Sequence, residues 1–198
     1  TGAIRNKTGN NTITGLLTMG ADAMIKSDAS TTLTIDSKGI SATTRALTIG
    51  GLGNTTFTST APIYGTTATL TKNDTGTLTI QSFSNFTGAT IINKGTIVLS
   101  SLGAMPLSVG MTINAGATLT LDNTSSSTVI DRLADSLALT MNGGNFNFIG
   151  SSFASMDESA GALTSGIATQ SGNNIITITP GSGGSTTMQF ASLSRTAG

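Results

Sequence analysis

Hydrophobic and polar residues alternate strictly along much of the chain, and threonine occupies most of the polar positions of this pattern. A period of two places successive side chains on opposite faces of a strand, so the pattern predicts strands with one buried face. The β-branched side chain of threonine suits an outer, pleated face. The clearest segments are 32–35, 46–49, 69–71, 77–80, 118–121, 145–149 and 176–179. The sequence therefore predicts an all-β fold.

Short clusters of glycine, asparagine and aspartate separate the predicted strands, as in residues 73–76. These residue types tolerate left-handed backbone angles and therefore close tight corners at low cost. One stretch departs from the pattern, because the apolar residues of 128–137 follow helical spacing with Asp131, Arg132 and Asp135 on the other side. We expect a single short helix or turn there.

An Asn-x-Gly corner recurs along the chain and is the most informative feature of the sequence. Residues 92–99 align without gaps with residues 141–148, and residues 113–121 align after one inserted residue. Each copy consists of the end of a strand, the corner and the start of a new strand. The candidate structural corner residues are Asn93, Gly95, Asn114, Gly116, Asn142 and Gly144, with Gly76 and Gly88 as further corner glycines.

Short strands joined by recurring corners are typical of a solenoid, in which each coil buries its apolar edge against its neighbours. We therefore predict a right-handed parallel β-helix, with a β-sandwich as the alternative because it also contains many short strands. Asparagines at equivalent corners would stack into side-chain amide ladders. We expect residues 1–198 to form a single solenoid segment, excised from or repeated within a longer chain.

The charge balance excludes several classes of partner. The chain has nine basic and nine acidic side chains and no net charge, so no field would attract nucleic acid or an anionic membrane. It has no cysteine, so its stability must come from packing and backbone ladders. No apolar run approaches the ~18 residues that a membrane-spanning helix needs.

The inventory of reactive side chains argues against an enzyme. Without histidine or cysteine, neither a Ser-His-Asp triad, a Cys-His pair nor a histidine-ligated metal site can form. Two acidic pairs remain, Asp131 with Asp135 and Asp157 with Glu158, and we expect all four in solvated or capping positions. We therefore assign no catalytic residue, cofactor or metal.

Two Asx pairs could donate oxygens to Ca²⁺, Asp122-Asn123 and Asn73-Asp74. Neither shows the alternating acidic ligands of a calcium loop. The tendency of these residues to form turns explains both pairs.

Thr-x-Thr pairs invite comparison with ice-binding surfaces. Such a surface needs its pairs in one flat rank at a constant period. The spacing between these pairs along the chain jumps from about twenty to about sixty residues. We therefore expect strand propensity to explain them. The pairs are Thr12 with Thr14, Thr32 with Thr34, Thr77 with Thr79, Thr118 with Thr120, and Thr177 with Thr179.

Residues 70–80 and 85–99 resemble the autotransporter-associated β-strand repeat. The shared features are Leu-Thr-Lys at the start, Gly-Thr-Leu-Thr at 76–79, an aromatic-Thr-Gly at 86–88 and Asn-x-Gly-Thr at 93–96. Asp74 stands where the pattern of that family usually has its first glycine. Residues 132–198 look like the segment that follows such repeats in very long bacterial surface proteins.

This resemblance implies a β-helical passenger that is exported and displayed on, or shed from, a bacterial envelope. The expected function is a structural component of an extracellular surface or matrix, a rigid stalk or fibre segment. The alternative is an adhesin or carbohydrate-binding module that uses the exposed threonine and asparagine face. The expected partners are other copies of the chain or neighbouring repeats, head to tail, and glycans or a host or cell surface.

Overall fold

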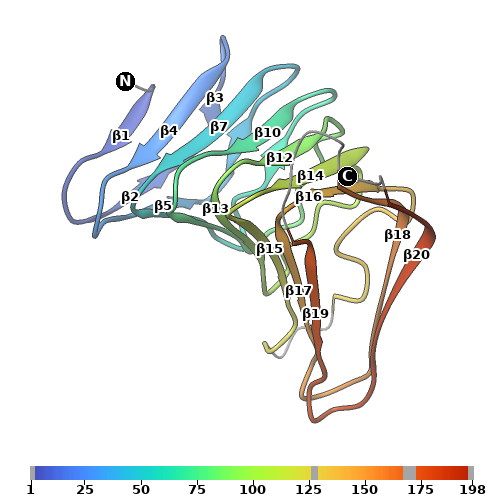
Figure 1. Cartoon of the computed structure of the whole chain (residues 1–198). Helices are drawn as coiled ribbons and strands as arrows, with labels where there is room; N and C mark the ends of the chain where they lie inside the picture. Colours follow the sequence, from blue (N-terminus) through green and yellow to red (C-terminus); the bar gives the residue numbers. More distant parts are fainter. Residues whose placement is uncertain (1–2, 126–128, 167–172, 196–198) are drawn as a thin grey trace.

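The computed structural model describes residues 3–125, 129–166 and 173–195, which form twenty β-strands in three parallel sheets and contain no helix. The chain runs repeatedly through sheet A, then through sheet B, and returns along a third side to the next strand of sheet A (Figure 1). The molecule is therefore a β-solenoid, as the sequence predicts.

Sheet A contains nine strands, and sheet B contains eight. Sheet A consists of β1 (Ile4–Asn6), β4 (Ala23–Ser27), β7 (Ala46–Gly51), β10 (Thr69–Lys72), β12 (Thr90–Ile92), β14 (Gly110–Asn114), β16 (Ala138–Asn142), β18 (Met156–Ser165) and β20 (Thr186–Arg195). Sheet B consists of β2 (Asn10–Thr14), β5 (Thr32–Asp36), β8 (Asn54–Phe57), β11 (Thr77–Ile80), β13 (Gly95–Leu99), β15 (Ala117–Asp122), β17 (Asn145–Ile149) and β19 (Ile175–Thr179). Sheet C consists of β3 (Leu17–Thr18), β6 (Ile40–Ser41) and β9 (Ile63–Tyr64).

Equivalent positions of successive coils pair directly, although the coils differ in length. Leu70 pairs with Thr90, twenty residues further on, whereas Leu163 pairs with Leu193, thirty residues further on. The ladders between the strands of all three sheets are parallel. A β-sandwich is built from antiparallel sheets, so that alternative is excluded.

The core lies inside the coils, and in the central strands every second side chain points into it. In β11, Leu78 and Ile80 are fully buried, and the threonines between them are partly exposed. In β17, Phe146 and Phe148 are buried in the same way. Full burial of one such side chain contributes about 1.5–3 kcal/mol. The strict alternation in the sequence is thus the source of the core.

The third side of the coils is the least regular. Beyond sheet C, Phe83 pairs with Ala104, and Met105 pairs with Leu133, through isolated parallel bridges. The described residues 129–137 contain one turn, at residues 135–136, and no helix. Residue 128, where the predicted helical spacing starts, lies outside the described residues.

Hydrogen bonds between coils explain why residues 129–137 are not helical. The Arg132 carbonyl oxygen accepts a hydrogen bond from the Met105 N–H, in the preceding coil. The N–H groups of Arg132 and Leu133 donate to the carboxylate of Glu158, in the following coil. Leu133 and Leu137 fill the core, whereas Ile130 is 64% exposed. The apolar spacing therefore reflects an irregular path along the core.

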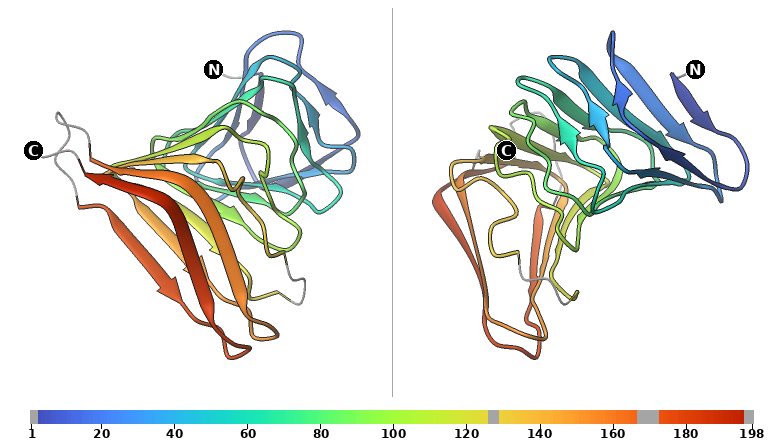
Figure 2. Two further views of the ribbon diagram at one scale, coloured as in Figure 1. Left: turned by 90° about the vertical axis from the view of Figure 1, so that its right-hand side faces the viewer. Right: turned by 180° about the vertical axis from the view of Figure 1, so that it is seen from behind.

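The later coils are drawn out compared with the earlier ones. The two further views show the orange and red strands extending well beyond the green and blue coils (Figure 2). Strands β18 and β20 each contain ten residues and pair along most of their length. The cross-section of the solenoid therefore changes along the stack.

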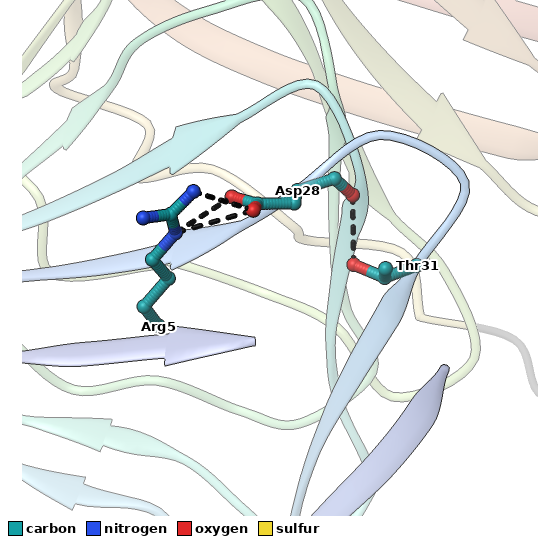
Figure 3. A network of polar contacts seen from close by, with 3 residues as sticks. All are labelled: Arg5, Asp28 and Thr31. Atoms are coloured by element: carbon teal, nitrogen blue, oxygen red, sulfur yellow. Dashed lines mark hydrogen bonds and ion pairs between the residues drawn. The ribbon is translucent and has the colours of Figure 1, made fainter. Parts of the chain in front are cut away.

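An ion pair ties β1 to the turn that follows β4. Arg5 donates from Nε and Nη2 to the carboxylate of Asp28, with a shortest distance of 2.6 Å (Figure 3). Thr31 Oγ1 donates to the Asp28 carbonyl oxygen at 2.7 Å. The hydrogen bonds from Arg5 hold the pKa of Asp28 below its usual range. The Arg5 side chain is largely exposed, so this pair is screened by solvent.

Candidate functional site

A ladder of asparagine side chains runs along the corner between sheets A and B. Asn93 Nδ2 donates to Asn73 Oδ1 at 2.8 Å, and Asn114 Nδ2 donates to Asn93 Oδ1 at 2.8 Å. Asn142 Nδ2 continues the series to Asn114 Oδ1 at 3.1 Å. Hydrogen bonds between asparagine side chains therefore join four coils, in addition to the backbone ladders.

Two glycines of this corner have left-handed backbone angles, Gly95 with a φ of 74° and Gly116 with a φ of 78°. A Cβ atom at Gly95 would lie 2.5 Å from the carbonyl oxygens of Asp74 and Gly76. A Cβ atom at Gly116 would meet nothing within 4 Å. The backbone angle demands glycine at both positions, and close packing against the preceding coil demands it only at Gly95.

The other candidate corner glycines lie where coils approach closely. A side chain at Gly76 would overlap the Gly53 carbonyl oxygen, and one at Gly144 would overlap Ile113. Gly88 lies at the entrance to sheet A, away from the asparagine ladder, and its carbonyl oxygen accepts a hydrogen bond from Ser108. The predicted set therefore occupies two different corners of the coil.

The family comparison matches residues 70–99 to the family described as passenger-associated-transport-repeat. The similarity covers this segment of the 198-residue chain, which is called the passenger-associated transport repeat below. The resemblance drawn from the sequence is confirmed over this segment. The searches of curated proteins and of solved structures found no match.

The passenger-associated transport repeat spans β10 to β13 and buries one lysine at its first corner. Lys72 is 1% exposed, and its Nζ donates to the carbonyl oxygens of Asn73 at 2.7 Å, Asp74 at 2.8 Å and Lys94 at 3.4 Å. Burial lowers the pKa of Lys72 to about 8. The ammonium group therefore donates hydrogen bonds to carbonyl oxygens that would otherwise be left without partners at the tight corner.

Asp74, which stands where the resemblance drawn from the sequence implies a glycine, adopts a backbone conformation that favours glycine. Its φ of 59° is left-handed, which aspartate tolerates better than most residues. Its Oδ2 accepts a hydrogen bond from the Gly51 N–H at 2.8 Å. The substitution thus adds a bond to the preceding coil.

A second buried cation lies outside the repeat. Arg132 is fully buried, and its Nε donates to Asn123 Oδ1 at 2.7 Å. Its Nη2 donates to the carbonyl oxygens of Ser101 and Asp122, each at 3.1 Å, and its Nη1 donates to the carbonyl oxygen of Gly103. Burial lowers the pKa of Arg132 to about 10. One side chain therefore holds backbone from two successive coils.

Glu158 completes this network from the next coil. It is 2% exposed, and it accepts hydrogen bonds from the N–H groups of Arg132, at 2.9 Å, and Leu133, at 3.0 Å. Burial raises the pKa of Glu158 to about 7, although both backbone donors oppose the shift. Arg132 and Glu158 together link three coils.

Glu158 corrects the expectation that both acidic pairs occupy solvated or capping positions, because it is buried whereas Asp131, Asp135 and Asp157 are exposed. Arg132, for which no position was predicted beyond the polar side of the expected helix or turn, is also buried. A signal for Glu158 was available, because the period of two in β18 places it on the inward face with Met156 and Ala160. No comparable pattern marks Arg132, since the chain around it is irregular.

Among the described residues, no three acidic side chains gather closely enough to hold a metal ion. In the Asx pair at 122–123, Asp122 Oδ1 accepts from the N–H and hydroxyl of Thr124, and Asn123 binds Arg132. No helix among these residues is long and apolar enough to cross a bilayer.

Proposed function

We propose that the chain is a stalk segment of an autotransporter-type passenger, a structural component of a bacterial extracellular surface or matrix without catalytic activity. The passenger-associated transport repeat at residues 70–99 supports this placement. The carrying observation is the uninterrupted parallel pairing of nine strands in sheet A and eight in sheet B. In such a stack each coil adds about 4.8 Å of length, so chain length becomes rod length.

Solution scattering from the purified chain tests the stalk. For the single chain the expected length along the stack is about 38 Å, with a cross-section that broadens toward β18 and β20. Two copies joined in tandem are expected to be about twice as long with the same maximum cross-section, and a tandem that scatters as a near-spherical particle would contradict the proposal.

The proposed partner is another copy of the chain, or a neighbouring repeat, placed end to end. At the β19 and β20 side of the stack, Ile178 is 43% exposed and Leu193 is 71% exposed. At the β1 side, an apolar hollow of about 260 Å³ is lined by residues that include Ile4, Ala23 and Leu47. The strand pairings of sheet A connect equivalent positions of successive coils in one row, which starts at Ala23 and Leu47. Leu193 lies at the other end of this row. The two ends therefore present matching apolar surfaces.

Sedimentation over a range of concentrations tests end-to-end association. Leu193→Asp is expected to abolish association, and Leu102→Asp, at another exposed leucine, is expected to leave it unchanged. A wild-type chain that remains monomeric at high concentration would exclude association of copies. That result would leave the stalk itself intact.

The proposed location is the outer surface of the bacterium or its surroundings, as the repeat family suggests. Antibody labelling of intact source cells tests this location. Labelling before permeabilisation is expected, whereas labelling only after permeabilisation would contradict it.

A polar hollow supports the second candidate, an adhesin or carbohydrate-binding module. Beside the asparagine ladder, Lys26, Lys94, Asp74, Asn73 and Asn93 surround an open hollow of about 500 Å³. Amide and ammonium groups in one hollow suit hydrogen bonds to sugar hydroxyl or carboxylate groups. A glycan array tests this function, with Lys26→Ala and Lys94→Ala together expected to remove the binding. Absence of wild-type binding to any glycan would count against it.

A further inference from the structure

The outer face of sheet B carries a rank of threonines that the Thr-x-Thr pairs compared in the sequence do not reveal. Thr12 pairs with Thr34, Thr34 pairs with Thr56, and Thr56 pairs with Thr79. These partners follow one another after 22, 22 and 23 residues, so the spacing is nearly constant once β8 is included. The Thr-x-Thr pairs named from the sequence do not all enter this rank, since Thr14 pairs with Asp36.

A second rank lies two residues earlier on each strand. Thr32 lies between Asn10 and Asn54 in this rank, and Thr77 pairs with Thr96 on the next strand. Asn10 Oδ1 accepts from the Thr32 N–H at 3.0 Å, and Asn54 Oδ1 accepts from the Thr77 N–H at 3.1 Å. These bonds fix neighbouring strands to each other. Together the two ranks on β2, β5, β8, β11 and β13 form a surface that we name the threonine face. Its residues are Asn10, Thr12, Thr32, Thr34, Asn54, Thr56, Thr77, Thr79, Thr96 and Val98.

The threonine face forms a regular two-dimensional grid. Neighbouring strands lie about 4.8 Å apart, and residues two apart on one strand are separated by about 6.7 Å. Both distances are close to repeat distances between water molecules on the surfaces of hexagonal ice. The face is confined to these five strands, because β15, β17 and β19 turn toward the bottom of Figure 1.

The threonine side chains are held in a narrow range of conformations. They are β-branched and therefore stiff about χ1. From β5 to β13 the threonines of the face are only partly exposed, since neighbouring side chains pack against each other along each rank. Ordering such a grid against a solid surface costs little conformational entropy.

The chemistry of the face favours a neutral, ordered partner. None of the nine basic and nine acidic residues of the chain lies in it, so a charged polymer finds no counter-charge there. It contains no aromatic side chain on which a sugar ring could stack. Its groups are hydroxyls, amides and methyls, which match the uncharged surface of crystalline water.

We propose that the threonine face binds ice. Each hydroxyl takes the place of a water molecule of the outermost crystal layer, and the methyl groups fill the spaces between rows. One such bond adds little, because it replaces a bond to liquid water. Affinity therefore depends on many hydroxyls meeting the lattice at once, which the register of sheet B provides. This activity is independent of the stalk function.

An ice-recrystallisation assay on the purified chain tests the proposal, together with uptake of the fluorescently labelled chain into a growing ice crystal. The test variant is Thr56→Lys with Thr79→Lys, two adjacent positions at the centre of the threonine face. The matched control is Thr48→Lys with Thr71→Lys, two paired and partly exposed threonines on the outer side of sheet A. Circular dichroism and urea unfolding establish that both variants keep the fold.

The expected result is inhibition and uptake by the wild-type chain and by the sheet A control, with loss of both in the sheet B variant. A wild-type chain without inhibition would overturn the proposal. Equal loss in both folded variants would also overturn it, as would binding to crystalline cellulose in place of ice. A rod-shaped particle that fails to bind ice would remove this activity and leave the stalk in place.

Discussion

Arg132 has the environment that differs most from that of an ordinary arginine, because its guanidinium group is fully buried. Its donors satisfy three carbonyl oxygens and the side chain of Asn123. The nearby carboxylate of Glu158 offsets part of the charge. A buried ion with a complete set of partners is tolerated, but each partner depends on the other.

Removal of the guanidinium group should be strongly destabilising. Arg132→Met leaves four acceptors without their donor and Glu158 without its countercharge, so we expect a loss of about 3–5 kcal/mol in the free energy of unfolding. The exposed Arg45 is the matched control, and Arg45→Met should change stability by less than about 0.5 kcal/mol. Urea unfolding measures both. Equal effects of the two substitutions would contradict the network.

Glu158 should make stability depend on pH in the weakly acidic range. The pKa of Glu158 is raised from 4.5 to about 7 by burial, so the folded chain binds more protons than the unfolded chain between these values. Stability contributed by this group is therefore lost as pH rises from about 4.5 to about 7. Urea unfolding across this range should show the decline in wild type and in Asp157→Asn. A Glu158→Gln variant with the same decline would contradict the assignment.

Single residues are predictable from sequence where they obey the alternation. Leu78 and Ile80 are inward as expected, and the same period would have placed Glu158 inward. The acidic charge of Glu158 predicted an exposed position, because acidic residues are usually exposed. Arg132 could not be predicted, since its partners come from backbone brought together only by the coil.

At the scale of elements, the corner between sheets A and B combines tight backbone with side-chain bonds. Asn73, Asn93, Asn114 and Asn142 form a ladder along it. Lys72 binds the carbonyl groups of the same corner in the passenger-associated transport repeat. The corner is thus a stabilising element of the stack and not only a connection.

Two glycines offer a matched test of corner packing. Gly95→Ala adds both an unfavourable backbone angle and a clash with the carbonyl oxygens of Asp74 and Gly76. Gly116→Ala adds the backbone angle alone, at a cost of about 1–2 kcal/mol. Gly95→Ala should therefore lower the unfolding midpoint in urea well below that of Gly116→Ala. Similar midpoints would show that the coils are not in close contact there.

The asparagine ladder should contribute measurably to stability. Asn93→Ala removes one donated and one accepted side-chain hydrogen bond, each worth about 0.5–1.5 kcal/mol. Asn85→Ala, at an exposed asparagine outside the ladder, is the control. Thermal unfolding should separate the two variants, with Asn93→Ala the less stable. If the two melt together, the ladder bonds add nothing beyond the backbone pairing.

Elements with a regular period were predictable, and irregular ones were not. The strands follow from alternation. Of the helix or turn expected at 128–137, the described residues show a turn at 135–136 and no helix, because bonds between coils take the backbone groups that a helix would use. Thr12, Thr34, Thr56 and Thr79 align in one rank and follow one another after 22, 22 and 23 residues. The sequence prediction missed this rank because the Thr-x-Thr pairs that it compared include none from β8.

At the scale of the whole molecule, the solenoid depends on each coil pairing with the next in one constant register. Stability in such a stack is close to a sum of coil and neighbour terms. Because neighbouring strands of a sheet lie about 4.8 Å apart, each coil is displaced from the one before it by this distance along the stack. The all-β class and the solenoid follow from the recurring corners, whereas the drawn-out coils of β18 and β20 leave no signal in the corner pattern.

Distances between spin labels test this register most directly. The chain has no cysteine, so pairs of introduced cysteines carry labels at chosen sites only. Thr12 and Thr79 lie three strands apart in one rank of sheet B, and Thr12 and Val98 lie four strands apart. At about 4.8 Å per strand, the backbone separations are about 14 Å and about 19 Å. Distances that grow with the number of strands would support the stacked solenoid, and equal or randomly ordered distances would contradict it.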